Sequence, residues 1–232
     1  NGLAPHVEGG REYISIRPIV FGGDDVTFVC DGRIGLRAAQ VYLEAFNRQQ
    51  IPDASGTNRP AIAAAGVAIV KSGYPFARAY ELSEQLCANA KRAVQRKAPA
   101  LDWHMAQGGL YGTLGEIRAR EYGEDCNEQG EILTSLLMRP VTVGASTALE
   151  WRTWDNFVAL QRAFKADWAT SKLMNLRETL RQGASAVRIF TRNHGELPPA
   201  DLRATQYRQT GWESGRCVYY DAIEMFEQEV NA

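Results

Sequence analysis

Short apolar runs alternate with longer amphipathic stretches over the first 106 residues of the chain. Two of these runs, Tyr13 to Phe21 and Val26 to Cys30, flank the tetrad Gly-Gly-Asp-Asp. This spacing predicts two strands joined in a β-hairpin. A further run, Ala61 to Val70, is too short for a buried helix. It predicts a strand that is covered on both faces.

Amphipathic stretches separate these apolar runs. Apolar residues recur at helical spacing over residues 33–50 and again over 77–97, which predicts two helices. The stretch Leu101 to Ala106 alternates and predicts a half-buried strand with Asp102 and His104 on its polar face. We expect His104 to be a strand-edge or packing residue rather than a general base. The order strand, strand, helix, strand, helix, strand indicates an α+β domain.

The second half of the chain has a different pattern. Residues 107–131 are rich in glycine and charge and are expected to be exposed, whereas Ile132 to Val143 is expected to rejoin the sheet as a strand. Residues 1–12 and 51–60 are expected to be loops. Helices are predicted over 148–164, over 172–183 with Thr170 or Ser171 as N-cap, over 184–192 and over 218–230. The pattern therefore predicts a sheet-based domain over residues 1–143 and a helical lobe over residues 144–232.

Composition excludes several classes of protein. The net charge of the 232 residues is -1, so nothing global favours nucleic acid or an anionic membrane. The four cysteines form no Cys-x-x-Cys pair, which argues against a zinc site or a disulfide framework and favours a reduced, cytoplasmic setting. No apolar run reaches membrane-spanning length. Because the chain opens without Met, we expect elements of the fold to precede residue 1.

The adjacent carboxylates of Asp24 and Asp25 are the strongest chemical signal. Two acids on a tight hairpin can hold a pair of Mg²⁺ ions, as polymerases and nucleotide cyclases require. Gly22 and Gly23 leave room for a nucleotide to approach the backbone. The same four residue types are also common in solvated turns, and the tetrad alone does not decide between these interpretations.

Several stretches, taken in order, resemble one family. They are "FGGDDVTFV" from Phe21, "AAAGVAIVKSGYPFARAYELSEQLCANAKR" from Ala63, "LDWHMA" from Leu101, and more loosely "WATSKLMNLRETLRQG" and "YYDAIEMFE". This combination resembles the palm domain of the type III CRISPR polymerase/cyclase large subunit with its C-terminal helical lobe. That domain is distantly related to the GGDEF-type nucleotide cyclases.

The resemblance implies a ferredoxin-like palm, an antiparallel sheet with helices on one face, followed by the helical lobe. Asp24 and Asp25 match the catalytic, metal-binding acids, with Mg²⁺ or Mn²⁺ as cofactor. Gly22, Gly23 and Asp24 match nucleotide-binding positions, and Lys91 matches a lysine that contacts the triphosphate. The alternative for Lys91 is a solvated residue on the polar face of a helix.

The implied activity is that of a nucleotidyl cyclase or polymerase of a CRISPR-like antiviral defence system. It would make cyclic oligoadenylate-type signals from ATP or another nucleoside triphosphate, with RNA-guided effector subunits or target RNA as partners. The family's palm begins with a strand that supplies a further metal ligand. Nothing before Tyr13 resembles that strand, so either it lies upstream of residue 1 or the protein has lost it.

Two alternatives remain open at this point. The protein could be a catalytically inactive palm scaffold of a nucleic-acid-bound defence complex. A cyclic dinucleotide cyclase is disfavoured because Val26 stands where that family has an acid. Aromatic and basic residues of the helical half could contact RNA, although such residues are more often core or solvated. They are Trp151, Trp154, Trp168, Arg152, Arg162, Arg177 and Arg181.

Overall fold

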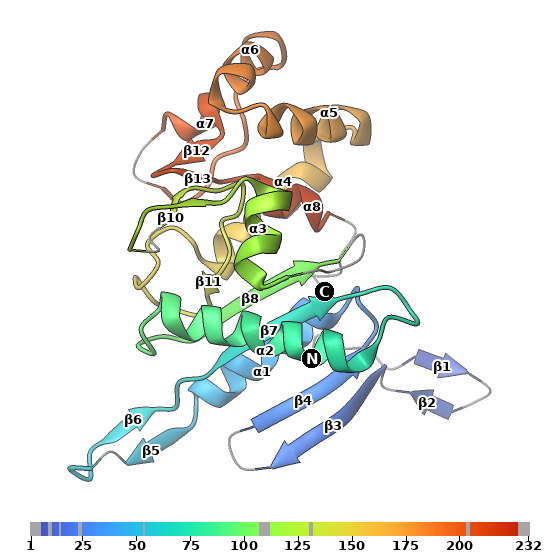
Figure 1. The fold of residues 1–232 in the computed structure, drawn as a ribbon, viewed down its shortest axis with the longest axis vertical. Helices are drawn as coiled ribbons and strands as arrows, with labels where there is room; N and C mark the ends of the chain where they lie inside the picture. The colour runs from blue at the N-terminus through green and yellow to red at the C-terminus, as the bar shows by residue number, and fades with distance from the viewer. Residues whose placement is uncertain are drawn as a thin grey trace.

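A three-stranded sheet lies at the centre of the protein (Figure 1). The computed structural model describes residues 6–8, 11–13, 15–22, 25–52, 54–106, 112–129, 132–202 and 205–226. Strand β8 (Ala100–Met105) lies between β7 (Ala64–Ile69) and β11 (Val141–Thr142). The pair β7–β8 is parallel and is connected through helix α2 (Phe76–Ala93), whereas β11 pairs antiparallel with β8. The apolar run ending at Val143 therefore rejoins the sheet only at its end.

Helices cover both faces of β7. The backbone of α2 packs against Gly66, while the next residue, Val67, contacts Gly35 of helix α1 (Gly35–Asn47). Because neighbouring residues of a strand point to opposite faces, α1 and α2 lie on opposite sides of the sheet (Figure 1). The chain is α+β as predicted, but the expected antiparallel sheet with helices on one face is wrong in both respects. A crossover helix between consecutive strands makes them parallel, and that connection is α2.

The predicted hairpin is confirmed. Strands β3 (Ile16–Gly22) and β4 (Asp25–Cys30) pair antiparallel, and Gly22 is the register partner of Asp25. The two strands form a sheet of their own within the described residues, separate from β7 and β8. In the described part of the chain the hairpin therefore does not extend the central sheet through hydrogen bonds.

Two segments expected to be loops contain short hairpins instead. The strands are β1 (His6–Glu8) with β2 (Arg11–Tyr13), and β5 (Gln50–Pro52) with β6 (Asn58–Pro60), both antiparallel. The residues of β5 and β6 are all exposed, so this ladder satisfies backbone hydrogen bonds without burying a side-chain face. Hydrophobic alternation gives no signal for such a strand pair.

Helix α3 (Leu114–Tyr122) corrects the expectation of an exposed excursion over residues 107–131. Its N-terminus is held by a capping box, in which the Thr113 hydroxyl accepts from the Glu116 N–H and the Glu116 carboxylate accepts from the Thr113 N–H. The helix buries Leu114, Ile117 and Tyr122 toward the body of the protein. Residues 107–111 and 130–131 lie outside the described part.

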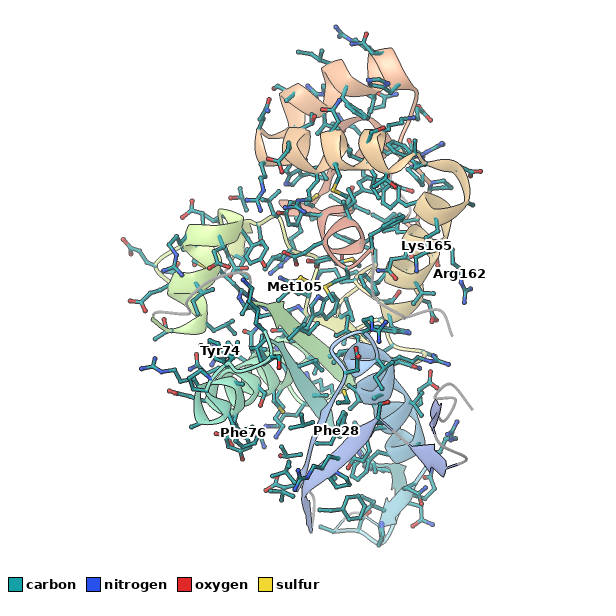
Figure 2. All side chains as sticks on the ribbon, turned by 90° about the vertical axis from the view of Figure 1, so that its right-hand side faces the viewer. Phe28, Tyr74, Phe76, Met105, Arg162 and Lys165 are labelled. Atoms are coloured by element: carbon teal, nitrogen blue, oxygen red, sulfur yellow. The ribbon has the colours of Figure 1, made fainter. Side chains whose placement is uncertain are left out.

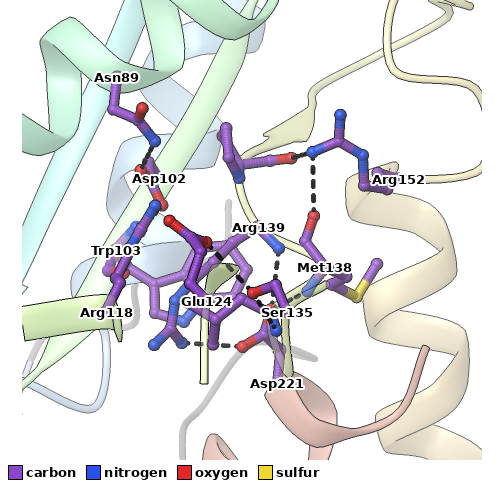
Figure 3. A network of polar contacts seen from close by, with 12 residues as sticks. Asn89, Asp102, Trp103, Arg118, Glu124, Ser135, Met138, Arg139, Arg152 and Asp221 are labelled. Atoms are coloured by element: carbon purple, nitrogen blue, oxygen red, sulfur yellow. Dashed lines mark hydrogen bonds and ion pairs between the residues drawn. The ribbon is translucent and has the colours of Figure 1, made fainter. Parts of the chain in front are cut away.

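Because α3 covers it, β8 is not half-buried as predicted. Asp102 and His104 are both fully buried. Asp102 Oδ1 accepts from Arg118 Nη2 of α3 at 2.6 Å, and Asp102 Oδ2 accepts from Asn89 Nδ2 of α2 at 2.8 Å (Figure 3). His104 packs edge-on against Tyr122, so it is a packing residue in a central strand. The polar face of this strand joins the two helices to the sheet.

The burial of His104 predicts a pH-dependent stability. Burial, together with the charges of Arg139 and Arg118, lowers the pKa of His104 to about 3. In the unfolded chain this imidazole titrates near pH 6.5. The contribution of the neutral His104 to the stability of the folded protein is therefore complete above about pH 6.5 and is lost as the pH falls toward 3. At pH 5 the expected loss is about 2 kcal/mol.

The variant His104→Phe tests this expectation, because it keeps a planar ring where neither imidazole nitrogen has a hydrogen-bond partner. Urea unfolding at pH 7.5 and pH 5 should show a loss of stability that is smaller in the variant by about 2 kcal/mol. An equal pH dependence in both proteins would assign the loss to other groups.

The helical half begins and ends its helices differently from the sequence pattern. Helix α4 begins at Trp154 rather than at residue 148, since Thr153 is its N-cap and accepts from the Asn156 N–H at 3.1 Å. Helix α5 has Ala169 as N-cap, not Thr170 or Ser171. The elements are α4 (Trp154–Asp167), α5 (Thr170–Arg181), α6 (Ala184–His194), α7 (Tyr207–Thr210) and α8 (Tyr220–Glu224), with short strands β9 (Asp125–Cys126), β10 (Ile132–Thr134), β12 (Trp212–Glu213) and β13 (Arg216–Cys217).

A shared core connects the sheet and the helical half. One cluster of buried residues includes Leu36 and Leu101 from the first half and Phe157 and Leu176 from the second. A buried polar network reinforces this junction: Asp221 Oδ2 accepts from the N–H groups of Met138 and Arg139, each at 2.9 Å (Figure 3). The helical half is therefore packed directly against the sheet through apolar and charged contacts.

Candidate functional site

The end of the β3–β4 hairpin carries the described part of the acidic tetrad. Gly22 and Asp25 are exposed register partners. A Cβ built on Gly22 meets no atom within 4 Å, so the space beside this backbone is open. Gly23 and Asp24 lie outside the described residues. The structure therefore places Gly22 and Asp25 at an accessible strand end.

One stripe of α2 interacts with this hairpin. The stripe consists of Tyr80, Glu84, Cys87 and Lys91, which recur at helical spacing and so share one face. Glu84 raises the pKa of the Tyr80 hydroxyl through a hydrogen bond and its charge, and Asp25 adds a smaller effect in the same direction. The Tyr80 hydroxyl also interacts with that of Thr27 on β4. The stripe and the hairpin are thus in contact.

The Cys87 thiol is influenced by both charges of interest, those of Asp25 and Lys91. Burial raises the pKa of Cys87, the ammonium of Lys91 lowers it, and Asp25 raises it again. Its Sγ donates to the carbonyl of Ala64 at 3.3 Å, which fixes it beside the first residue of β7. Asp25 and Lys91, 66 positions apart in sequence, therefore act on the same thiol.

The sequence interpretation missed the other members of this stripe. Tyr80, Glu84 and Cys87 precede Lys91 by eleven, seven and four positions, so counting back from the lysine at helical spacing would have found them. Nothing in the pattern indicates, however, that the stripe faces the hairpin. That relation depends on the packing of α2 across Gly66.

Strand β4 runs in the same direction as β7 (Figure 1). The charge of Asp25, at the start of β4, raises the pKa of Cys87. The Cys87 thiol in turn donates to the carbonyl of Ala64 at the start of β7. Gly32 lies just beyond the end of β4 and faces Ile69 at the end of β7. A Cβ built on Gly32 would lie 3.2 Å from Cγ2 of Ile69. In the described part of the chain the two strands are not paired.

Aromatic rings border the same region. In the view of Figure 2, Phe28 of the hairpin and Phe76 at the start of α2 lie on either side of β7 and β8. Phe76 is 51% exposed, and its ring centroid lies 6.2 Å from that of Tyr80. The exposed ring of Phe76 offers a stacking face to a planar base.

The described residues supply the right ligand type for Mg²⁺ but too few ligands. Asp25 and Glu84 are hard carboxylate donors that both act on Tyr80 and Cys87. No group of three or more His, Cys, Asp or Glu side chains in the described part of the chain is placed to hold a metal ion. A complete site would need donors beyond these, such as Asp24.

The residues considered for RNA contact are not gathered on one exposed surface. Trp151 and Trp154 are core residues, as their helical spacing favours. Arg152 is largely buried and donates to the carbonyls of Met138 and Pro140, each at 3.4 Å, and burial lowers its pKa to about 9. Arg181 is engaged with Tyr220 OH and the carbonyl of Glu121. Trp151, Trp154 and Arg152 therefore serve the packing of the helical half.

No protein-family model matches the chain, and no curated protein matches it significantly. Among the described residues, no helix combines the length and apolar character needed to cross a membrane.

Proposed function

We propose that this protein is a Mg²⁺-dependent nucleotidyl cyclase or polymerase of a CRISPR-like defence system. Its substrate would be ATP or another nucleoside triphosphate, and its products cyclic oligoadenylate-type signals. The observation that carries the proposal is that Lys91 hydrogen-bonds the Cys87 thiol, while the charge of Asp25, on an accessible hairpin end, raises the pKa of the same thiol. A carboxylate that can bind a metal and a cation that can bind phosphate are thereby brought to one place.

Each residue has a role that its position supports. Asp25, together with Asp24, would hold Mg²⁺, which when bound supplies charge stabilisation to the attacking hydroxyl and the triphosphate. The exposed Lys91 ammonium offers a mobile point charge to the phosphates. Gly22 leaves open space for the nucleotide, and the ring of Phe76 is accessible to its base.

Turnover by the Asp25→Asn variant tests the proposal. The protein is incubated with ATP and Mg²⁺ or Mn²⁺, and oligonucleotide products are separated and quantified. Because the amide keeps the shape but loses the charge that binds a cation, the rate should fall by about a hundredfold, roughly 2.7 kcal/mol of transition-state stabilisation.

The matched control is Asp31→Asn, which removes an exposed carboxylate at the far end of β4, where it pairs with Arg33 at 2.9 Å. Its turnover should stay within about twofold of the original, since surface ion pairs contribute little. If Asp25→Asn makes the original products at the original rate, the enzyme proposal fails. The inactive scaffold then becomes the better interpretation.

A further inference from the structure

A cavity in the helical lobe lies apart from the candidate site. It has a volume of about 270 Å³ and is lined by Arg188, Thr191, Arg192, Glu196 and Gln209. Helix α6, which supplies three of these residues, lies at the opposite end of the molecule from the β3–β4 hairpin (Figure 1). A ligand in this cavity would therefore not touch Asp25 or Lys91.

Two arginines give the cavity its charge. Arg188 and Arg192 are one helical turn apart on α6 and so lie on one face. Both are exposed, and neither forms an ion pair with any residue that the structure describes. Two like charges at this spacing repel each other mildly, and an anion between them would relieve that repulsion.

The acidic residue of the cavity is already neutralised. Glu196 Oε2 pairs with Arg208 Nη1 at 3.1 Å, and Glu196 Oε1 accepts from Gln209 Nε2 at 3.2 Å. The Glu196 carboxylate thus interacts with Arg208 and Gln209 and does not pair with Arg188 or Arg192. The net charge around the cavity, with Arg208 included, is positive.

The wall of the cavity is held in place by hydrogen bonds. Thr191 is 8% exposed, and its hydroxyl lies 3.2 Å from the carbonyl of Arg188 and 3.3 Å from that of Gln209. This contact ties α6 to the end of α7. The arginines thus project from a supported helix, although its C-terminal dipole does not itself favour an anion.

We propose that this cavity binds a phosphate group through Arg188 and Arg192. Guanidinium groups form paired, charge-assisted hydrogen bonds with phosphate oxygens, and the volume admits one phosphate with part of its substituent. The phosphate could belong to an RNA backbone or to a small phosphate compound. The chemistry of recognition is the same in both cases, so the experiment separates the two sources.

The test compares the double variant Arg188→Gln/Arg192→Gln with the control Arg48→Gln/Arg96→Gln, which removes the same charge from exposed positions elsewhere. Binding of inorganic phosphate is measured by titration calorimetry, and binding of a ten-nucleotide single-stranded RNA by fluorescence anisotropy at several salt concentrations. The cavity variant should lose at least about tenfold in affinity, and the control less than about threefold.

The two sources give different results. An RNA phosphate predicts that the double variant loses RNA affinity and that its salt slope falls by about 1.4, for two phosphate contacts. A small phosphate compound predicts loss of inorganic phosphate binding with RNA binding unchanged. The proposal is overturned if the wild-type protein binds neither probe, or if the cavity variant and the control behave alike. Because no nucleotide turnover is measured, this outcome is independent of the Asp25→Asn result.

Discussion

Replacing Arg139 with methionine is expected to destabilise the protein by about 3–5 kcal/mol. The guanidinium is fully buried and Nη1 lies 3.0 Å from Asp221 Oδ1 and 2.7 Å from Glu224 Oε2. Burial alone would lower the pKa of Arg139, but these two carboxylates raise it well above its ordinary value. Methionine fills much of the volume yet leaves both acids buried without their cation.

Loss of the Arg139 side chain should also weaken the packing of the sheet against the helical half. Arg139 stacks over the rings of Trp103 in β8 and Tyr122 in α3, with its Cζ 5.3 Å and 5.0 Å from their centroids. Its ion pairs reach α8, so one side chain connects the sheet to the C-terminal helix. Unfolding of Arg139→Met in guanidinium chloride should therefore have a lower midpoint concentration. The near-ultraviolet circular dichroism of these rings should be weaker in the variant.

Arg33→Met is the matched control for Arg139→Met. Arg33 also pairs with a carboxylate, Asp31 at 2.9 Å, but both side chains are exposed, at 64% and 41%. Water screens this pair, so its loss should cost less than about 1 kcal/mol. If both substitutions lowered the free energy of unfolding equally, burial would not be the reason that the Arg139 ion pairs stabilise the protein.

The substitution Gly66→Ala is expected to cost about 3 kcal/mol and to displace α2. The added Cβ would lie 2.1 Å from the carbonyl oxygen of Ser83 and 2.4 Å from the amide nitrogen of Cys87. Both atoms belong to the backbone of α2, so no side-chain rotation relieves the clash. The helix must move away from β7, and Lys91 moves with it.

Unfolding measurements and hydrogen exchange on Gly66→Ala would detect both effects, with faster exchange across α2 and β7. The control is Gly115→Ala in the first turn of α3, where a Cβ meets nothing within 4 Å. That change should stabilise the protein slightly, by about 0.5–1 kcal/mol, because alanine is the better helix former. A neutral Gly66→Ala would mean that α2 can shift at little cost, and the convergence of Asp25 and Lys91 would then be loosely held.

The candidate site was only partly predictable from the sequence. The hairpin and the helix that carries Lys91 both follow from hydrophobic periodicity, and the tetrad marks Asp25 as chemically interesting. Glu84 and Cys87 carried no signal of their own. They enter the site only because Gly66 lets α2 pack closely on β7 and turn its polar stripe toward Asp25.

Helix α3 was missed for a related reason. Residues 107–131 carry many glycines and charges, and the helix that lies among them buries a charged side chain, Arg118, against Asp102. An apolar stripe is the signal that periodicity detects, and an ion pair inside the protein breaks it. The pair Thr113 and Glu116, a capping box at sequence spacing, was the available indication of a helix start.

By itself, the sequence determined where most long helices and strands form, that two apolar strands meet at Gly-Gly-Asp-Asp, and that the chain is α+β. Local periodicity and turn residues carry this information because they depend on neighbours a few positions apart. Only the tertiary structure decided that β7 and β8 are parallel, that helices cover both faces, and that Asp102, His104 and Arg139 are buried. Those outcomes depend on contacts between distant segments, whose free energy no local pattern records.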